Sequence, residues 1–234
     1  MNRSYPVTPQ INPITAKELN RKTAIHEAGH AAAIYFGNKK KQLPPVFFQI
    51  DIKKLKNAGQ SSNTDSHWIA KVEGGRLIHT LPSSIEEATC DFSPAQKQAY
   101  LYAFEADIIN LLVGPLAEAN YVALRDDEII NSSLVTLNSL HNYGGASDLK
   151  IAQDYIECFI SDKSAQEQKM SALFLAAFHF INDGAVWRAI TALANYLLAH
   201  HKNSIECEEI IAVLDAHFFS KRRDVALQRL HKFR

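Results

Sequence analysis

The pentapeptide His26–His30 reads His-Glu-Ala-Gly-His and combines two imidazoles and a carboxylate at a spacing suited to metal chemistry. It lies within residues 14–37, which are predicted to form a helix. On a helix, positions i and i+4 lie on one face about one turn apart, so both imidazoles can reach one ion. Glu27 can then reach a metal-bound water and act as a general base. This is the arrangement of zinc hydrolases.

The residues around this motif fit a helix. Thr15 and Glu18 have the spacing of a capping box, in which both side chains bind free amides at a helix start. Gly37 follows the last apolar residue and fits a helix C-cap. Gly29 disfavours a helix by about 1 kcal/mol relative to Ala, so its place between the two His predicts a close approach by another segment. The same pentapeptide can also arise by chance on an amphipathic helix with solvated His, and that alternative stays open.

Composition limits the class of protein. The chain has 234 residues, which fits one large domain or two small ones, and its formal net charge of zero does not suggest a general nucleic-acid binder. The basic runs at 39–41 and 221–223 are interpreted as solvated. Three widely spaced cysteines, Cys90, Cys158 and Cys207, indicate a reducing compartment without a disulfide framework. We therefore expect a cytoplasmic protein.

The sequence carries neither a targeting signal nor a nucleotide motif. Residues 1–13 contain no apolar segment typical of a secretion signal. The apolar runs are far shorter than the ~20 residues needed for a membrane span, so a soluble chain without a span is expected. No phosphate-binding Gly-x-x-x-x-Gly-Lys loop is found, so no ATPase is evident in this sequence.

The predicted fold class is mostly α (α+β), with a small β-sheet or hairpin inserted early in a helical domain. Residues 1–13 are predicted to be an extended lead, and 14–220 a single domain. Within it, residues 38–92 form the β insertion and residues 93–218 the helical part, followed by a basic helix or tail at 221–234.

Two segments of the insertion have strand character. Residues 46–52 are rich in β-branched and aromatic residues. Residues 68–72 and 76–80 flank Glu-Gly-Gly and predict a hairpin. Residues 53–66 and 82–93 are predicted loops.

The helical part starts at Ser93 and Pro94, an N-cap followed by proline, and its first helix is predicted to run to about residue 120. A further helix is predicted to begin near Asp148. Three others are expected at 164–181, 184–201 and 205–218, after which a short helix closes the chain.

A catalytic zinc requires a third protein ligand. Ala33 and Phe36 stand where the metzincin pattern requires Gly and His. No Glu occurs between His30 and Glu73, which excludes the thermolysin-type solution. The third ligand must therefore come from farther along the chain, where the candidates are Asp148, Glu118, His79 and His141. Asp148 follows a glycine-rich turn and opens a helix, although Asp at a helix start is also common without a metal.

Four stretches together resemble the protease domain of FtsH, the membrane-bound ATP-dependent zinc metalloprotease. Residues 23–31 resemble its Ala-x-His-Glu-Ala-Gly-His-Ala helix. Residues 109–118 resemble its Leu-x-Gly-Gly-Arg-Ala-Ala-Glu helix, and 144–149 its Gly-Ala-x-Asn-Asp-Leu turn and helix start. Residues 192–198 and 205–211 resemble its closing helix pair. The resemblance extends over about residues 15–217.

This resemblance implies a zinc metalloendopeptidase and assigns roles by position. Glu27 is the general base. The zinc ligands are His26, His30 and Asp148. The residues that support the site without binding the metal are Gly29, Glu118 and Ser147.

The chain also departs from the family's pattern. The stretch between His30 and Asp148 is several dozen residues longer, and Pro115 and Leu116 replace part of a Gly-Arg-Ala pattern. The sequence contains neither the ATPase domain nor the membrane anchor of that family. A separate ATPase partner and a homo-oligomer therefore remain open expectations.

The expected substrate is a peptide or unfolded protein, and no nucleic acid is expected as a partner. An extended substrate could pair with a strand formed by Trp68, Ile69, Ala70, Lys71 and Val72, which could equally be an ordinary structural hairpin. Two other functions remain open. One is a non-catalytic binding or regulatory module, and the other is a zinc hydrolase that acts on a non-peptide amide.

Overall fold

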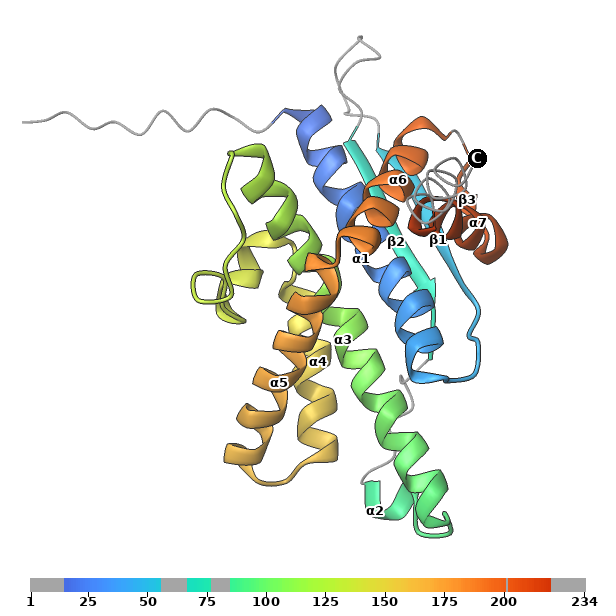
Figure 1. Cartoon of the computed structure of the whole chain (residues 1–234), viewed down its shortest axis with the longest axis vertical. Coiled ribbons are helices and arrows are strands. Elements are labelled where there is room, and N and C mark those ends of the chain that lie inside the picture. Colours follow the sequence, from blue (N-terminus) through green and yellow to red (C-terminus); the bar gives the residue numbers. More distant parts are fainter. Residues whose placement is uncertain (1–14, 56–66, 77–84, 201, 220–234) are drawn as a thin grey trace, which may run out of the picture.

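A computed structural model of the chain describes residues 15–55, 67–76, 85–200 and 202–219. This part is mostly helical and carries a small antiparallel sheet of three strands, which confirms the predicted mostly-α class (Figure 1). Among the described helices, none has both the length and the apolar composition to cross a bilayer. The predicted N-terminal lead at 1–13 and tail at 221–234 lie outside the described residues, as do the predicted helix closing the chain, most of the loop at 53–66 and His79.

Helix α1, Ala16–Lys41, carries the pentapeptide. Thr15 caps its start by accepting a hydrogen bond from the Glu18 main-chain N–H at 3.2 Å. The predicted C-cap at Gly37 is wrong, because the helix continues for another turn to Lys41 and its C-cap is Gln42, whose φ is 54°. The added turn contains three lysines, and cations are stabilising at a helix C-terminus.

The predicted capping box at this helix start is half correct. The Glu18 carboxylate is directed to α3, Pro94–Arg125, rather than to its own N-cap. It accepts hydrogen bonds from Arg125 at 2.7 Å and from the Tyr121 hydroxyl at 3.1 Å. The side chain thus links the start of α1 to the end of α3.

The sheet has the strand order β2-β1-β3. Strand β1, Phe48–Leu55, pairs antiparallel with β2, His67–Gly74, and with β3, Ser204–Ile205. The partner of the predicted strand 68–72 is therefore β1, with Ile50 opposite Val72. Strand β2 continues through Gly74, two residues into the Glu-Gly-Gly segment that was predicted to form the turn of a hairpin.

Two observations explain this strand pairing. Alternate residues of β1, Phe48, Ile50 and Ile52, are buried, so pairing with β1 places β2 over the core. Gly74 and Gly75 have φ values of 101° and 83°, so the chain turns only after β2 has ended. The other predicted arm, 77–80, lies outside the described residues. Because β3 comes from the C-terminal part, the sheet is not confined to the predicted insertion.

Helix α3 begins at a complete capping box formed by Ser93 and Gln96, as the N-cap prediction requires, and runs five residues beyond its predicted end. It crosses α1 closely. A Cβ on Gly29 would lie 2.9 Å from the Cβ of Ala117, so the close approach predicted from this glycine is present. The crossing places the two His residues of α1 against the middle of α3.

The remaining helices complete the core (Figure 1). A short helix, α2 (Ile85–Ala88), lies in the predicted loop 82–93, which is a correction. A 3-10 helix, η2 (Asn138–Tyr143), leads through two glycines into α4 (Ala146–Phe159), which begins two residues before Asp148. The last three helices agree closely with the predicted ranges and are α5 (Lys163–Asn182), α6 (Gly184–Ala199) and α7 (Cys207–Phe218).

Candidate metal centre

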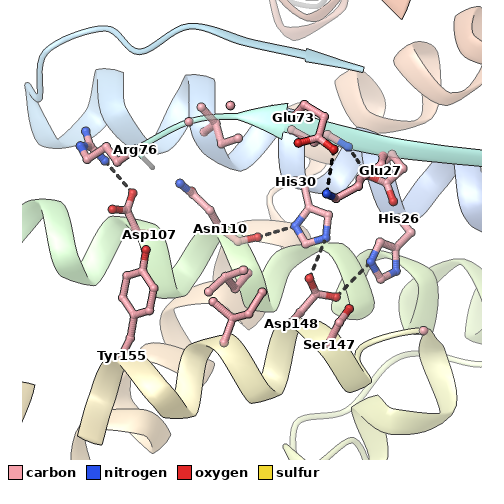
Figure 2. Close-up of a pocket in the computed structure, with 18 of the residues that line it drawn as sticks. His26, Glu27, His30, Glu73, Arg76, Asp107, Asn110, Ser147, Asp148 and Tyr155 are labelled. Carbon is pink, nitrogen blue, oxygen red and sulfur yellow. Dashed lines mark hydrogen bonds and ion pairs between the residues drawn. The ribbon is translucent and has the colours of Figure 1, made fainter. Parts of the chain in front are cut away.

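Three side chains from two helices converge at one point of the molecule (Figure 2). His26 and His30 project from one face of α1, as their spacing predicts. Asp148 projects from the first turn of α4. Its Oδ2 lies 3.3 Å from His26 Nε2, and its Oδ1 lies 3.6 Å from His30 Nε2. One ligand atom from each residue lies within 4.8 Å of the others, a grouping able to hold a metal ion.

The donor set fits a zinc ion. Two imidazole nitrogens and one carboxylate are a common protein ligand set for catalytic zinc, with an open fourth position. Ligand atoms about 2.1 Å from a tetrahedral ion lie about 3.4 Å from one another. The separations of 3.3 Å and 3.6 Å between Asp148 and the two His match this value. Helix α1 supplies both nitrogens and α4 the carboxylate.

The second ring nitrogen of each His also has an acceptor. His26 Nδ1 lies 3.4 Å from Oε2 of Glu118 on α3. His30 Nδ1 lies 2.7 Å from the main-chain carbonyl oxygen of Asn110, also on α3. Such contacts hold the ring in place and leave Nε2 for the metal, as in known zinc sites. Helix α3 therefore aims both imidazoles at Asp148.

Buried charges control the protonation of this cluster. Burial alone would lower the pKa of His26, but hydrogen bonds to Asp148 and Glu118 and the nearby charge of Glu27 raise it to about 10. Burial would raise the pKa of Asp148, but the two His residues hold it below its ordinary value. The carboxylates of the cluster thus stabilise a positive charge at His26, and a bound metal cation would replace the proton on this residue.

Glycines allow this close assembly. A Cβ on Gly114 of α3 would overlap the His30 ring at Nε2. Gly144, which has a φ of 71°, would place a Cβ 3.3 Å from His26 Nδ1 and 3.2 Å from Glu118 Oε2. Gly29 had predicted a close approach by another segment, and Gly114 in the middle of α3 marks where His30 meets that segment. Nothing in the residue types indicated the Asn110 carbonyl, because every residue carries one.

Glu27 follows His26 on α1 and is oriented by the sheet. Its Oε2 accepts a hydrogen bond of 2.7 Å from the main-chain N–H of Val72 in β2. Figure 2 shows this contact beside the two His rings, with β2 running above α1. The strand that the sequence suggested for substrate pairing therefore contacts the predicted general base directly.

The cluster lies at one end of a cavity with a volume of about 550 Å³. The end of β2 covers it from Lys71 to Arg76, and α3 and α4 form its other walls. Its lining includes the apolar side chains of Ile34, Leu111 and Ile151. Ser147, expected to support the site, lies on its wall beside Asp148.

An ion pair between Arg76 and Asp107 lies at the far end of the cavity (Figure 2). Arg76 donates hydrogen bonds of 2.8 Å to Asp107 Oδ1 on α3 and to Asn38 Oδ1 on α1. Asp107 is only 7% exposed, and its burial raises its pKa to about 6 despite the opposing effect of Arg76. Tyr155 of α4 lies beside it (Figure 2). No pattern in the sequence had indicated this pair.

The other sequence candidates for the third ligand take different places. Glu118 contacts His26 Nδ1 and is not part of the metal-binding group found among the described residues. His141 lines a separate cavity with Leu149 and Met170. His79 lies outside the described residues. Among the three candidates that the structure describes, only Asp148 meets both His residues.

Comparisons with family models and with curated proteins found no relative of this chain. No model of a known protein family matches the chain, and no curated protein matches it at a significant level. The functional argument therefore rests on the residues and on the geometry of the site.

Proposed function

We propose that this protein is a zinc-dependent peptidase that resembles the protease domain of FtsH. One observation carries the proposal, namely that Asp148 meets Nε2 of both His26 and His30 at the head of a cavity, with Glu27 beside them. The parts that a metallopeptidase site needs therefore lie side by side. They are three candidate metal ligands, a carboxylate that can act as a base, and a cavity for a substrate.

In the proposed mechanism, His26, His30 and Asp148 hold zinc. A zinc ion held there would supply Lewis acidity, which would make water a stronger nucleophile at neutral pH and polarise the scissile carbonyl. Glu27 takes the proton of the attacking water and delivers it to the leaving amine. Glu118 and the Asn110 carbonyl keep the two imidazoles oriented.

The edge of the sheet supports a peptide as the substrate. Among the strands that the structure describes, β2 is an outer strand in the order β2-β1-β3, and residues Lys71–Gly74 line the cavity. An outer strand can pair with an extended peptide through main-chain hydrogen bonds, which orient a substrate independently of its sequence. The apolar side chains Ile34, Leu111 and Ile151 can receive a side chain of that peptide.

The direct test is Glu27→Gln, with cleavage of unfolded casein and bound zinc measured in parallel. We expect zinc to stay bound and cleavage to fall about 100- to 10,000-fold, the usual contribution of a general base. The control variant Glu73→Gln changes a carboxylate of the same cavity that touches Lys71 rather than Glu27. It should keep most of the activity.

Two results would contradict the proposal. Zinc-loaded Glu27→Gln protein with undiminished cleavage would remove the general-base role. Wild-type protein that binds zinc but cleaves neither casein nor peptides would favour a binding module or a hydrolase of another amide. Chelation of the metal should abolish cleavage in the wild type, and re-addition of zinc should restore it.

A further inference from the structure

The main-chain N–H of Val72 faces away from the sheet and toward the candidate site. The neighbouring strands establish this direction. On β1, the Ile52 N–H donates to the Asn203 carbonyl at 2.7 Å, on the β3 side. Main-chain groups of residues two apart in a strand point to the same side, so Ile50 also faces β3. Val72, opposite Ile50, therefore has its N–H directed away from β1.

This outward N–H has a definite acceptor. It donates to Oε2 of Glu27 at 2.7 Å, which is short for an N–H···O bond and typical of one that ends on a charged oxygen. The bond joins residues 45 positions apart in the chain and connects β2 with α1. A glutamate side chain has three rotatable bonds, so α1 alone cannot determine where its carboxylate lies.

We propose that the Val72 main-chain N–H is a positioning group for the general base, reserved for Glu27 rather than for a substrate. This inference rests on the proposed peptidase function. The register of β2 on β1 sets the place of the Val72 N–H, and that N–H sets the place of the Glu27 carboxylate. A peptide added to β2 pairs through other main-chain groups of the edge, such as those of Ala70.

The first experiment does not depend on catalytic activity of the protein. Hydrogen exchange of the Val72 amide is measured by NMR in the wild type and in Glu27→Ala. An outward amide on a sheet edge exchanges fast unless it is bonded. We expect the Glu27→Ala change to speed exchange at Val72 about tenfold or more, the range for a bond to a charged group. The Ala70 amide, on the same edge, serves as the control and should keep its rate.

The second experiment separates positioning from substrate binding. Val72→Pro removes the N–H, and proline is compatible with an edge strand whose N–H faces outward. Val72→Ala keeps the N–H and removes most of the side chain. We expect kcat on an extended peptide to be at least about tenfold lower for Val72→Pro than for Val72→Ala, because the base loses its position. KM should differ less than about twofold between the two variants, because a group that does not contact the substrate contributes little to substrate binding.

The outcomes distinguish this proposal from the proposed function. Unchanged exchange at Val72 in Glu27→Ala would overturn the positioning role whatever the activity. A higher KM with equal kcat for Val72→Pro would assign the N–H to the substrate instead. If the wild type cleaves no peptide, the proposed function fails, and the exchange result still decides whether Val72 holds Glu27. Circular dichroism and zinc content show whether Val72→Pro is folded, and the exchange experiment stands without that variant.

Discussion

Both ends of the cavity carry carboxylates beside basic side chains, but the two ends differ in their charge balance. At one end, the carboxylates of Glu27, Asp148 and Glu118 surround two imidazoles, and among the described residues one lysine is paired there, Lys22, 4.0 Å from Glu118. At the other end, one carboxylate, Asp107, meets one guanidinium, Arg76.

This difference in charge balance distinguishes an end suited to binding a cation from an end with a structural role. An ion pair that neutralises itself has no need of a further ion, and it fixes the end of β2 to α3. A cluster with more carboxylates than cations is stabilised by an added positive charge. Burial makes the contrast stronger, since screening by water is weak at both ends. The proposed metal chemistry is therefore assigned to the end that contains Asp148.

The largest effect is expected on zinc affinity, when the same Asp-to-Asn substitution is made at each end of the cavity. Asp148→Asn should lower zinc affinity more than about 100-fold, beyond the range for residues that only orient ligands. Asp107→Asn makes the same change at the other end and should alter zinc affinity less than about twofold, since it touches no candidate ligand. Competition with a chromophoric chelator measures both. Equal losses would show that the two ends do not differ in this way.

The next test uses two glycines in helix interiors. Gly114→Ala places a Cβ against His30 Nε2, so the ring must move. We expect activity to fall about 100-fold, the usual cost of a misplacement of about 1 Å in a site, together with loss of bound zinc. Gly37→Ala has its nearest contact at 3.7 Å, which is ordinary. It should retain zinc and raise the free energy of unfolding by about 0.5–1 kcal/mol.

A smaller effect is expected for the residue that orients His26. Glu118→Gln keeps the size of the side chain and removes its charge. Zinc affinity should fall about 10- to 100-fold, because a weaker acceptor holds the imidazole less firmly. Isothermal titration with zinc in a competing buffer measures this change. A loss as large as that of Asp148→Asn would instead indicate that Glu118 itself binds the metal.

The smallest effect concerns the pH dependence of stability at the far end. The pKa of Asp107 is raised from 3.8 to about 6 in the folded protein. A folded state that binds the proton more tightly is favoured below both pKa values, and this stability is lost as pH rises through about 6. The wild type should lose about 1 kcal/mol relative to Asp107→Asn between about pH 5 and pH 7.5. Urea unfolding at both pH values measures it, and parallel curves would contradict the prediction.

Much of this architecture was predictable because it depends on local rules. The i, i+4 spacing placed His26 and His30 on one helix face, and the Ser93 N-cap marked the start of α3. The glycine at 29 indicated a close crossing before any partner was known. The ranges of the last three helices followed from the spacing of apolar residues.

The strand partners were less predictable. A segment with strand character can pair with any other, and the glycines at 74 and 75 predicted pairing of 68–72 with the segment that follows them, whereas its partner among the described residues is β1. Only burial of alternate β1 residues against the helices decided that β1 lies between β2 and β3. Helix ends also moved, since the basic last turn of α1 extended it past Gly37.

By itself, then, the sequence determined half of the candidate site, namely two imidazoles and a carboxylate on one helix, because helical geometry needs no distant partner. Residue types left four candidates for the third ligand, and a family resemblance implied one of them. Only the tertiary structure decided that Asp148 meets both His residues, that α3 orients their rings, and that Val72 holds Glu27. These contacts join segments 45 to more than 100 residues apart, and packing brings such segments together without a local signal.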